Sequence, residues 1–87
     1  MKTPNNQYQQ VLWYLYNFKK PFSLSQVINH SMFYKFQTRL GEIEKEHGFI
    51  AKRYKKNFIN VFGRSSICLL YEALDFKMIK KLYKLYE

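Results

Sequence analysis

Few residues of this chain have the types and spacing that catalysis or metal binding requires. His30 and His47 stand alone, without neighbouring ligands at the spacing that a zinc site needs. The lone cysteine, Cys68, lies in an apolar run, where a thiol is more often a small buried hydrophobe than a nucleophile. Three acids of one expected helix stand two residues apart: Glu42, Glu44 and Glu46. Residues two apart do not share a helix face, so these acids do not form a convergent carboxylate pair. The sequence therefore predicts a protein that is not an enzyme and that uses no metal or cofactor.

Basic side chains, by contrast, are numerous in this chain. Its 15 Lys and Arg against 6 Asp and Glu give a formal net charge of +9 over 87 residues. A charge of that size attracts polyanions, so the partners to consider are nucleic acid, an anionic membrane surface or an acidic protein. The alternative explanation is codon usage, because the amino acids of AT-rich codons are abundant here and lysine far outnumbers arginine. Part of the charge would then say little about function.

Two stretches place basic and hydrogen-bonding side chains where they suit double-stranded DNA. A helix is expected over Phe33–His47, and a helix fits the major groove, where base edges carry a full donor and acceptor code. Its candidate contacts to bases and nearby phosphates are Tyr34, Lys35, Gln37, Thr38 and Arg39. The segment from Ala51 to Tyr71 contains no acid, and its candidate phosphate contacts are Lys52, Arg53, Lys55, Lys56 and Arg64. The alternative interpretations are a merely solvated helix face and lysines that protect a sheet edge.

Hydrophobic spacing predicts the helices that position these residues. A first helix is expected over Gln7–Phe18, with Trp13, Tyr14 and Tyr16 pointing away from its buried stripe, which consists of Tyr8, Val11, Leu12, Leu15 and Phe18. Ser23 is expected to cap a second helix, which a turn at His30–Met32 separates from the third. The third helix should bury Phe33, Phe36, Leu40 and Ile43 and end at Gly48.

A β-hairpin and a last helix are expected to follow. The tip of the hairpin is placed at 55–57 or at 63–65, and the second position is favoured because it contains Gly63. Asp75 is expected to cap a helix that completes the core, forms a dimer or, least favoured, lies on an anionic membrane. The candidate dimer or partner interface consists of Trp13, Tyr16, Ile79, Leu82, Tyr83 and Tyr86.

One segment resembles a known family. The residues Arg39-Leu40-x-Glu42-Ile43, followed by Glu46-His47-Gly48-Phe49-Ile50, resemble the end of the recognition helix in winged helix-turn-helix domains of small prokaryotic and phage DNA-binding proteins. The resemblance covers about Gln9 to Leu74. The chain departs from the family at two places: many members have a small residue late in the first helix of the motif, where this chain has Val27 and Ile28, and a glycine in the turn, where it has Ser31 and Met32. The resemblance implies an α+β fold, a winged helix-turn-helix with three helices, a β-hairpin wing and a C-terminal helix.

The expected organisation is one domain with two short ends: a flexible N-terminus at 1–6, the winged helix-turn-helix at 7–74 and an amphipathic helix at 75–87. The function that the resemblance implies is double-stranded DNA binding, sequence-specific or structure-guided, by a small regulator of transcription or a replication or recombination accessory protein of a phage or mobile element. The alternative is a protein-interaction module that docks on a host or phage enzyme. With no signal peptide and no apolar run of roughly 20 residues, the protein is expected to be cytoplasmic and to have no membrane partner.

Overall fold

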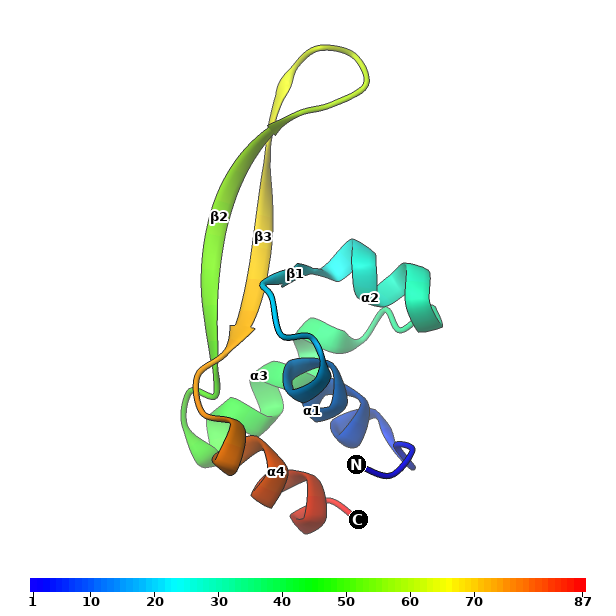
Figure 1. Ribbon diagram of the computed structural model, residues 1–87, viewed down its shortest axis with the longest axis vertical. Coiled ribbons are helices and arrows are strands. Elements are labelled where there is room, and N and C mark those ends of the chain that lie inside the picture. The colour runs from blue at the N-terminus through cyan, green and yellow to red at the C-terminus, as the bar shows by residue number, and fades with distance from the viewer.

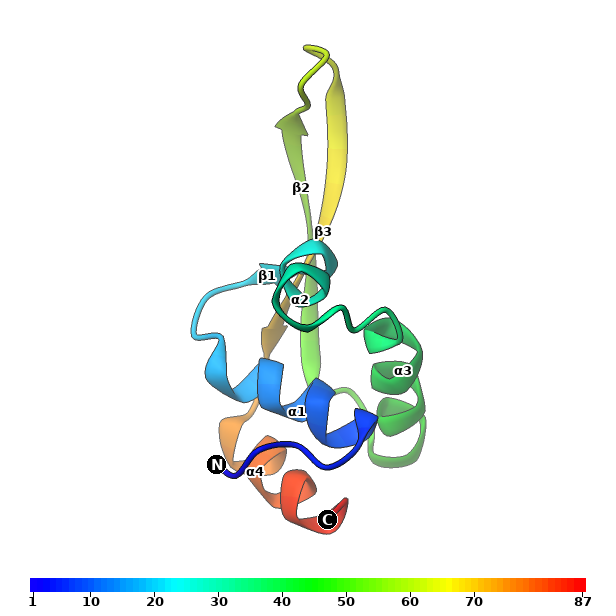
Figure 2. The same ribbon diagram turned by 90° about the vertical axis from the view of Figure 1, so that its right-hand side faces the viewer.

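The chain folds into a body of helices from which a long β-hairpin projects. The computed structural model describes residues 1–87 and combines helices with an antiparallel sheet, so the predicted α+β class is confirmed (Figure 1). The elements are α1 (Gln7–Asn17), β1 (Phe22–Ser23), α2 (Leu24–Ser31), α3 (Phe36–His47), β2 (Ala51–Ile59), β3 (Ser65–Ala73) and α4 (Phe76–Leu85). The molecule measures 45 × 23 × 21 Å, and the hairpin runs along the longest dimension in both perpendicular views (Figures 1 and 2). None of the helices is long and apolar enough to cross a bilayer.

Helix α1 lies at the centre of the body, where it packs against both α3 and α4. Asn6 caps it, since its Oδ1 accepts a hydrogen bond of 2.9 Å from the backbone N–H of Gln9. The expectation that Tyr14 points away from the core is wrong, because this side chain is only 2% exposed and its ring meets Phe36 edge-on. The reason is that α1 is covered on more than one side, so its apolar surface extends well beyond a single stripe.

The link between α2 and α3 differs from the predicted turn. Ser23 caps α2 as expected, in a reciprocal pair of hydrogen bonds with Gln26. Helix α2 then continues to Ser31, and Met32 adopts a left-handed conformation with φ 55° that ends it. Helix α3 therefore begins at Phe36 rather than at Phe33. Phe33 is nevertheless buried beside Phe36, with ring centroids 6.3 Å apart, so the apolar spacing that predicted a helix is satisfied across a turn.

The hairpin has two strands of nine residues each, and its turn contains the glycine that predicted it. Strands β2 and β3 pair without interruption from Ala51↔Ala73 to Ile59↔Ser65. The turn between them includes Gly63 at φ 75°, which confirms the favoured position. Strand β1 adds only a short third strand beside β3, with Phe22 opposite Tyr71. Most of the hairpin is thus a two-stranded ribbon.

The last helix is part of the core. Asp75 caps α4 as expected, through bonds to the N–H groups of Lys77 and Met78. One face of α4 packs on α1, and its buried residues are Ile79, Leu82 and Tyr83. The N-terminal segment, expected to be flexible, makes specific contacts with this helix: the Tyr83 hydroxyl donates to the carbonyl of Lys2, and the Asn6 amide donates to that of Tyr86 at 2.8 Å.

Candidate nucleic-acid interface

A buried carboxylate fixes the base of the hairpin to α3. The Glu44 side chain is only 6% exposed and accepts hydrogen bonds from the backbone N–H groups of Ile50 and Ala51, at 3.0 and 3.3 Å. It also pairs with the Arg53 guanidinium, whose Nη2 lies 2.5 Å from Oε1. The hydrogen bond to Glu44 raises the pKa of Arg53, so this guanidinium stays charged. Arg53, predicted to contact phosphate, is therefore an internal anchor for the start of β2.

Arg39 is likewise engaged within the chain. Its Nε donates to Gln7 at 2.7 Å, its Nη1 pairs with Glu42 at 2.9 Å, and its guanidinium lies over the ring of Tyr8. The Tyr8 hydroxyl donates to the same Glu42 carboxylate at 2.5 Å. Arg39 was predicted to contact bases, but in this structure it joins the outer side of α3 to the start of α1.

The Glu42 carboxylate makes one contact between α1 and α3 sensitive to pH. Hydrogen bonds from Tyr8 and then from Arg39 hold the pKa of Glu42 below its ordinary value. A carboxyl group with a lowered pKa in the folded state stabilises it above the unfolded pKa, and this contribution is lost as the pH falls through the folded pKa. We therefore expect the Tm of the wild type to fall more steeply than that of Glu42→Gln between about pH 5 and pH 3. Circular dichroism melts at a series of pH values measure this, with Glu46→Gln as the control; parallel curves for wild type and Glu42→Gln would contradict it.

Gln37 is the third predicted DNA contact, after Arg53 and Arg39, that makes a hydrogen bond within the fold. Its side-chain amide donates to the Tyr71 hydroxyl at 2.7 Å and so ties the first turn of α3 to β3. The other candidates on this side, Tyr34, Lys35 and Thr38, are exposed. Because α3 begins at Phe36, Tyr34 and Lys35 lie in the turn before the helix and not on it. Of the five predicted base and phosphate contacts on this side, those that stay exposed and unengaged therefore lie at the N-terminal end of α3.

The hairpin carries the remaining candidate cations, and none of them is neutralised. The exposed basic side chains on it are Lys52, Lys55, Lys56 and Arg64, besides the anchored Arg53. Every salt bridge in the chain uses Arg39, Arg53 or His47, so no lysine has a carboxylate within 4.0 Å. Of these four exposed side chains only Lys52 lies over an aromatic ring, with its Nζ 4.8 Å from the centroid of Tyr54. The outer hairpin therefore presents a positive surface to solvent.

The acidic side chains lie mostly on the helical body, away from this surface, and nearly all of them accept hydrogen bonds within the fold. Each one except Glu87 accepts a hydrogen bond from a neighbour, and the acceptors are Glu42, Glu44, Glu46, Glu72 and Asp75. Glu72 is the only acid on the hairpin, and it accepts from the Tyr54 hydroxyl on the facing strand. Its charge raises the pKa of Tyr54 through that hydrogen bond.

The residues proposed for a dimer or partner interface divide into two groups. Ile79, Leu82 and Tyr83 are at most 4% exposed and belong to the core of the chain itself, so they offer no surface while α4 stays in place. Trp13, Tyr16 and Tyr86 are half-buried at the edge of that core. Trp13 stacks on His30 with ring centroids 5.7 Å apart.

A polar cluster near the end of α2 was not foreseen from the sequence. The Tyr14 hydroxyl lies 2.7 Å from Nδ1 of His30 and donates to Oγ of Ser31 at 2.5 Å. A nucleophile and its base must contact each other directly, whereas here the phenol stands between serine and histidine. The cluster satisfies a hydroxyl on a buried ring and joins α1 to α2. No group of three or more His, Cys, Asp or Glu side chains lies close enough to hold a metal ion.

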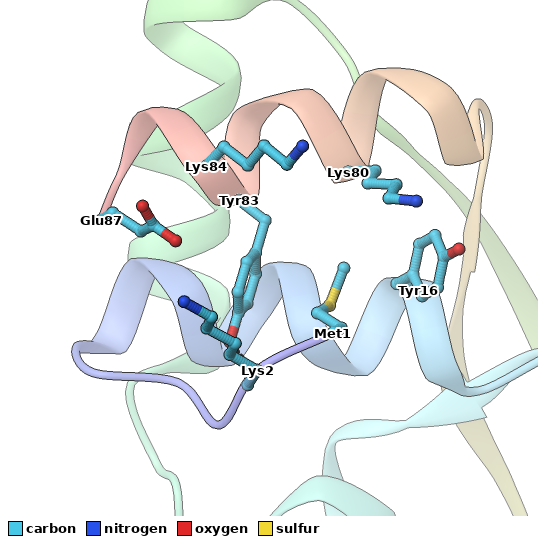
Figure 3. A pocket seen from close by; sticks show the side chains of 7 residues that line it. All are labelled: Met1, Lys2, Tyr16, Lys80, Tyr83, Lys84 and Glu87. Carbon is cyan, nitrogen blue, oxygen red and sulfur yellow. Dashed lines mark hydrogen bonds between the residues drawn. The ribbon is translucent and has the colours of Figure 1, made fainter.

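A hollow between the N-terminus, α1 and α4 has a volume of about 410 Å³ (Figure 3). It is lined by Met1, Lys2, Tyr16, Lys80, Tyr83, Lys84 and Glu87. Burial, and secondarily the charge of Glu87, raises the pKa of Tyr83, so its phenol stays protonated at neutral pH and does not act as a base. The hollow therefore presents lysines and apolar groups without a nucleophile paired to a base.

The exposed apolar residues at the tip of the hairpin were not predicted from the sequence. Val61 and Phe62 are 92% and 84% exposed, and Ile59, the last residue of β2, is 74% exposed. A signal for this was present, because consecutive apolar residues next to the turn glycine break the rule that turns are polar.

Comparisons of the chain with protein-family models, with curated proteins and with solved structures found no match.

Proposed function

We propose that this chain is a winged helix-turn-helix protein that binds double-stranded DNA, as a small regulator or a replication or recombination accessory factor. Two consecutive helices, α2 and α3, joined by a short turn and followed directly by a hairpin, support this interpretation. The DNA-contacting surface would consist of the exposed residues Lys35, Thr38, Lys52, Lys55, Lys56 and Arg64.

The observation that carries the proposal is the unneutralised charge of the hairpin. Lys55, Lys56 and Arg64 project from the body on a ribbon with no acid between Ala51 and Tyr71. Lysines that neutralise phosphates release condensed counterions, which supplies affinity that does not depend on base sequence. The hairpin would lie along the phosphate backbone in this way.

The start of α3 supports a second contact. Asn6, Ser23 and Asp75 cap the other helices with their side chains, whereas Lys35, the residue before α3, makes no side-chain hydrogen bond to the first turn. Unpaired N–H groups at a helix N-terminus favour phosphate, and Lys35 adds a full positive charge there. Thr38, exposed on the first turn of α3, would contact a base edge or a phosphate from that end.

The test is a salt titration of binding to a mixed-sequence duplex of about 20 base pairs, followed by fluorescence anisotropy. In the variant Lys35→Ala/Lys55→Ala/Lys56→Ala/Arg64→Ala, we expect the slope of log K against log salt to flatten by about 3 to 4 and the affinity to fall at least about 100-fold. The matched control, Lys77→Ala/Lys80→Ala/Lys81→Ala/Lys84→Ala, removes the same charge from α4 and should retain most of the affinity.

Circular dichroism must show that both variants remain folded, which their exposed positions favour. Failure of the wild type to bind near physiological salt would overturn the proposal. Equal losses in the two variants would also overturn it, because the charge would then act without regard to where it lies.

A further inference from the structure

We propose that the tip of the hairpin is an apolar wedge that enters the base stack of duplex DNA through the minor groove and kinks it. This inference rests on the proposed function and goes beyond it, because phosphate contacts alone require no apolar tip. The tip is defined here by Ile59, Val61 and Phe62.

The tip residues contribute little to the folded body. Val61 and Phe62 are more exposed than any side chain of the core, which is assembled from the helices and the base of the sheet. Both lie at the far end of the hairpin, beyond every helix (Figure 1). Exposed apolar groups gathered at one place indicate an interaction site.

Hydrogen bonds hold the tip in one shape before any partner binds. The backbone N–H of Asn60 donates to the carbonyl of Arg64 at 2.8 Å, and that of Gly63 donates to the carbonyl of Asn60 at 3.0 Å. The Asn60 side chain accepts from the N–H groups of Phe62 and Arg64 at 2.9 and 3.2 Å. An ordered turn of this kind keeps Val61 and Phe62 at the apex and lowers the entropy lost on binding.

The charges beside the tip identify the partner. Arg64 lies in the turn beside the apolar residues, Lys55 and Lys56 follow on β2 toward the body, and no acid stands among them. Duplex DNA combines an anionic exterior with an apolar stack of bases, so it matches cations that flank an apolar point. Proteins that bend DNA from the minor groove insert Phe, Ile, Leu or Met side chains between base steps and meet the surrounding phosphates with basic residues.

Two other partners fit the tip less well. A second copy that paired along the free edge of β2 would bring the lysines of both chains to one ladder, where like charges repel. Entry into a bilayer would carry Arg64 and the Asn60 side chain toward hydrocarbon, which is unfavourable for both. In a narrow minor groove, by contrast, an arginine is favoured.

The experiment separates bending from binding. A duplex of about 25 base pairs with a central TA step, the most easily kinked kind, carries a donor and an acceptor dye at its ends. We expect wild-type protein to raise energy transfer, in line with a bend of about 20–90°. The variant Val61→Ser/Phe62→Ser removes no charge, so it should keep the salt slope, bind about tenfold more weakly and lose the rise in energy transfer.

Phe49→Ser is the matched control. Phe49 is 83% exposed, nearly as much as Phe62, but it precedes β2 at the opposite end of the hairpin. This variant should bend DNA as the wild type does. A fluorescent 2-aminopurine in the TA step should brighten only with proteins that keep Val61 and Phe62.

The outcomes of these experiments distinguish failure of the wedge from failure of the proposed DNA binding. Wild-type binding with a steep salt slope and no change in energy transfer would overturn the wedge and leave the proposed DNA binding intact. No DNA binding by the wild type would overturn both. Tip-dependent cosedimentation with phosphatidylcholine–phosphatidylserine vesicles, without bending of DNA, would assign the tip to a membrane surface instead.

Discussion

Replacing Glu44 by alanine is expected to lower the free energy of unfolding by about 3 kcal/mol. The carboxylate is buried, pairs with Arg53 and accepts from the N–H groups of Ile50 and Ala51. Its removal leaves a guanidinium without its partner and backbone donors without an acceptor, and each of these is unfavourable in a partly buried site. Urea unfolding followed by circular dichroism measures the effect.

Glu46→Ala is the control for this variant. It removes the same charge from the same helix, but the Glu46 side chain is 69% exposed, so the expected change is within about 0.5 kcal/mol. If the two variants lose equal stability, Glu44 is not an anchor. Because Glu44 joins α3 to β2, Glu44→Ala should also weaken DNA binding under conditions where the protein is still folded.

Phe36→Ala is expected to lower the free energy of unfolding by about 3 to 5 kcal/mol. Phe36 is fully buried at the junction of α1, α3 and the sheet, and its ring meets those of Tyr14, Phe22 and Tyr71 at 6.4, 5.7 and 5.2 Å. A chain of this length has a total stability of about 4 to 13 kcal/mol, so such a loss brings it close to unfolding at 25 °C.

Phe62→Ala, at the hairpin tip, is the control for Phe36→Ala. Phe62→Ala removes an identical ring from a side chain that is 84% exposed, and its expected effect on stability is within about 0.5 kcal/mol. Thermal and urea unfolding of both variants measure the difference. A large loss of stability in Phe62→Ala would mean that the tip packs within the fold, which would contradict its role as a free wedge.

Features that depend on neighbouring residues were predictable from the sequence. Ser23 and Asp75 were predicted as caps because a capping side chain bonds to N–H groups only two or three residues further on. The buried positions Phe36, Leu40 and Ile43 follow from helical spacing, and Gly63 marks the hairpin turn.

Features that join distant residues were not predictable. Glu44 and Arg53 lie nine positions apart and Gln37 and Tyr71 thirty-four, and nothing in either local pattern specifies these pairs. An arginine or glutamine on the outward face of a helix gives the same sequence pattern whether its side chain contacts DNA or a residue of its own chain. The start of α3 was misplaced for a related reason, because Phe33 reaches the core from a turn as well as it would from a helix.

The short third strand has a consequence for motion. Strand β1 pairs with β3 only at Tyr71 and Leu70, and Leu69 still packs against the core, so the ribbon beyond the pair Lys55↔Leu69 is supported mainly by its own two strands. An isolated two-stranded ribbon is marginally stable in water. Its amide hydrogens should therefore exchange with solvent through local opening while the helical body stays closed. The outer hairpin therefore behaves as a separate thermodynamic unit, whose opening costs less free energy than global unfolding.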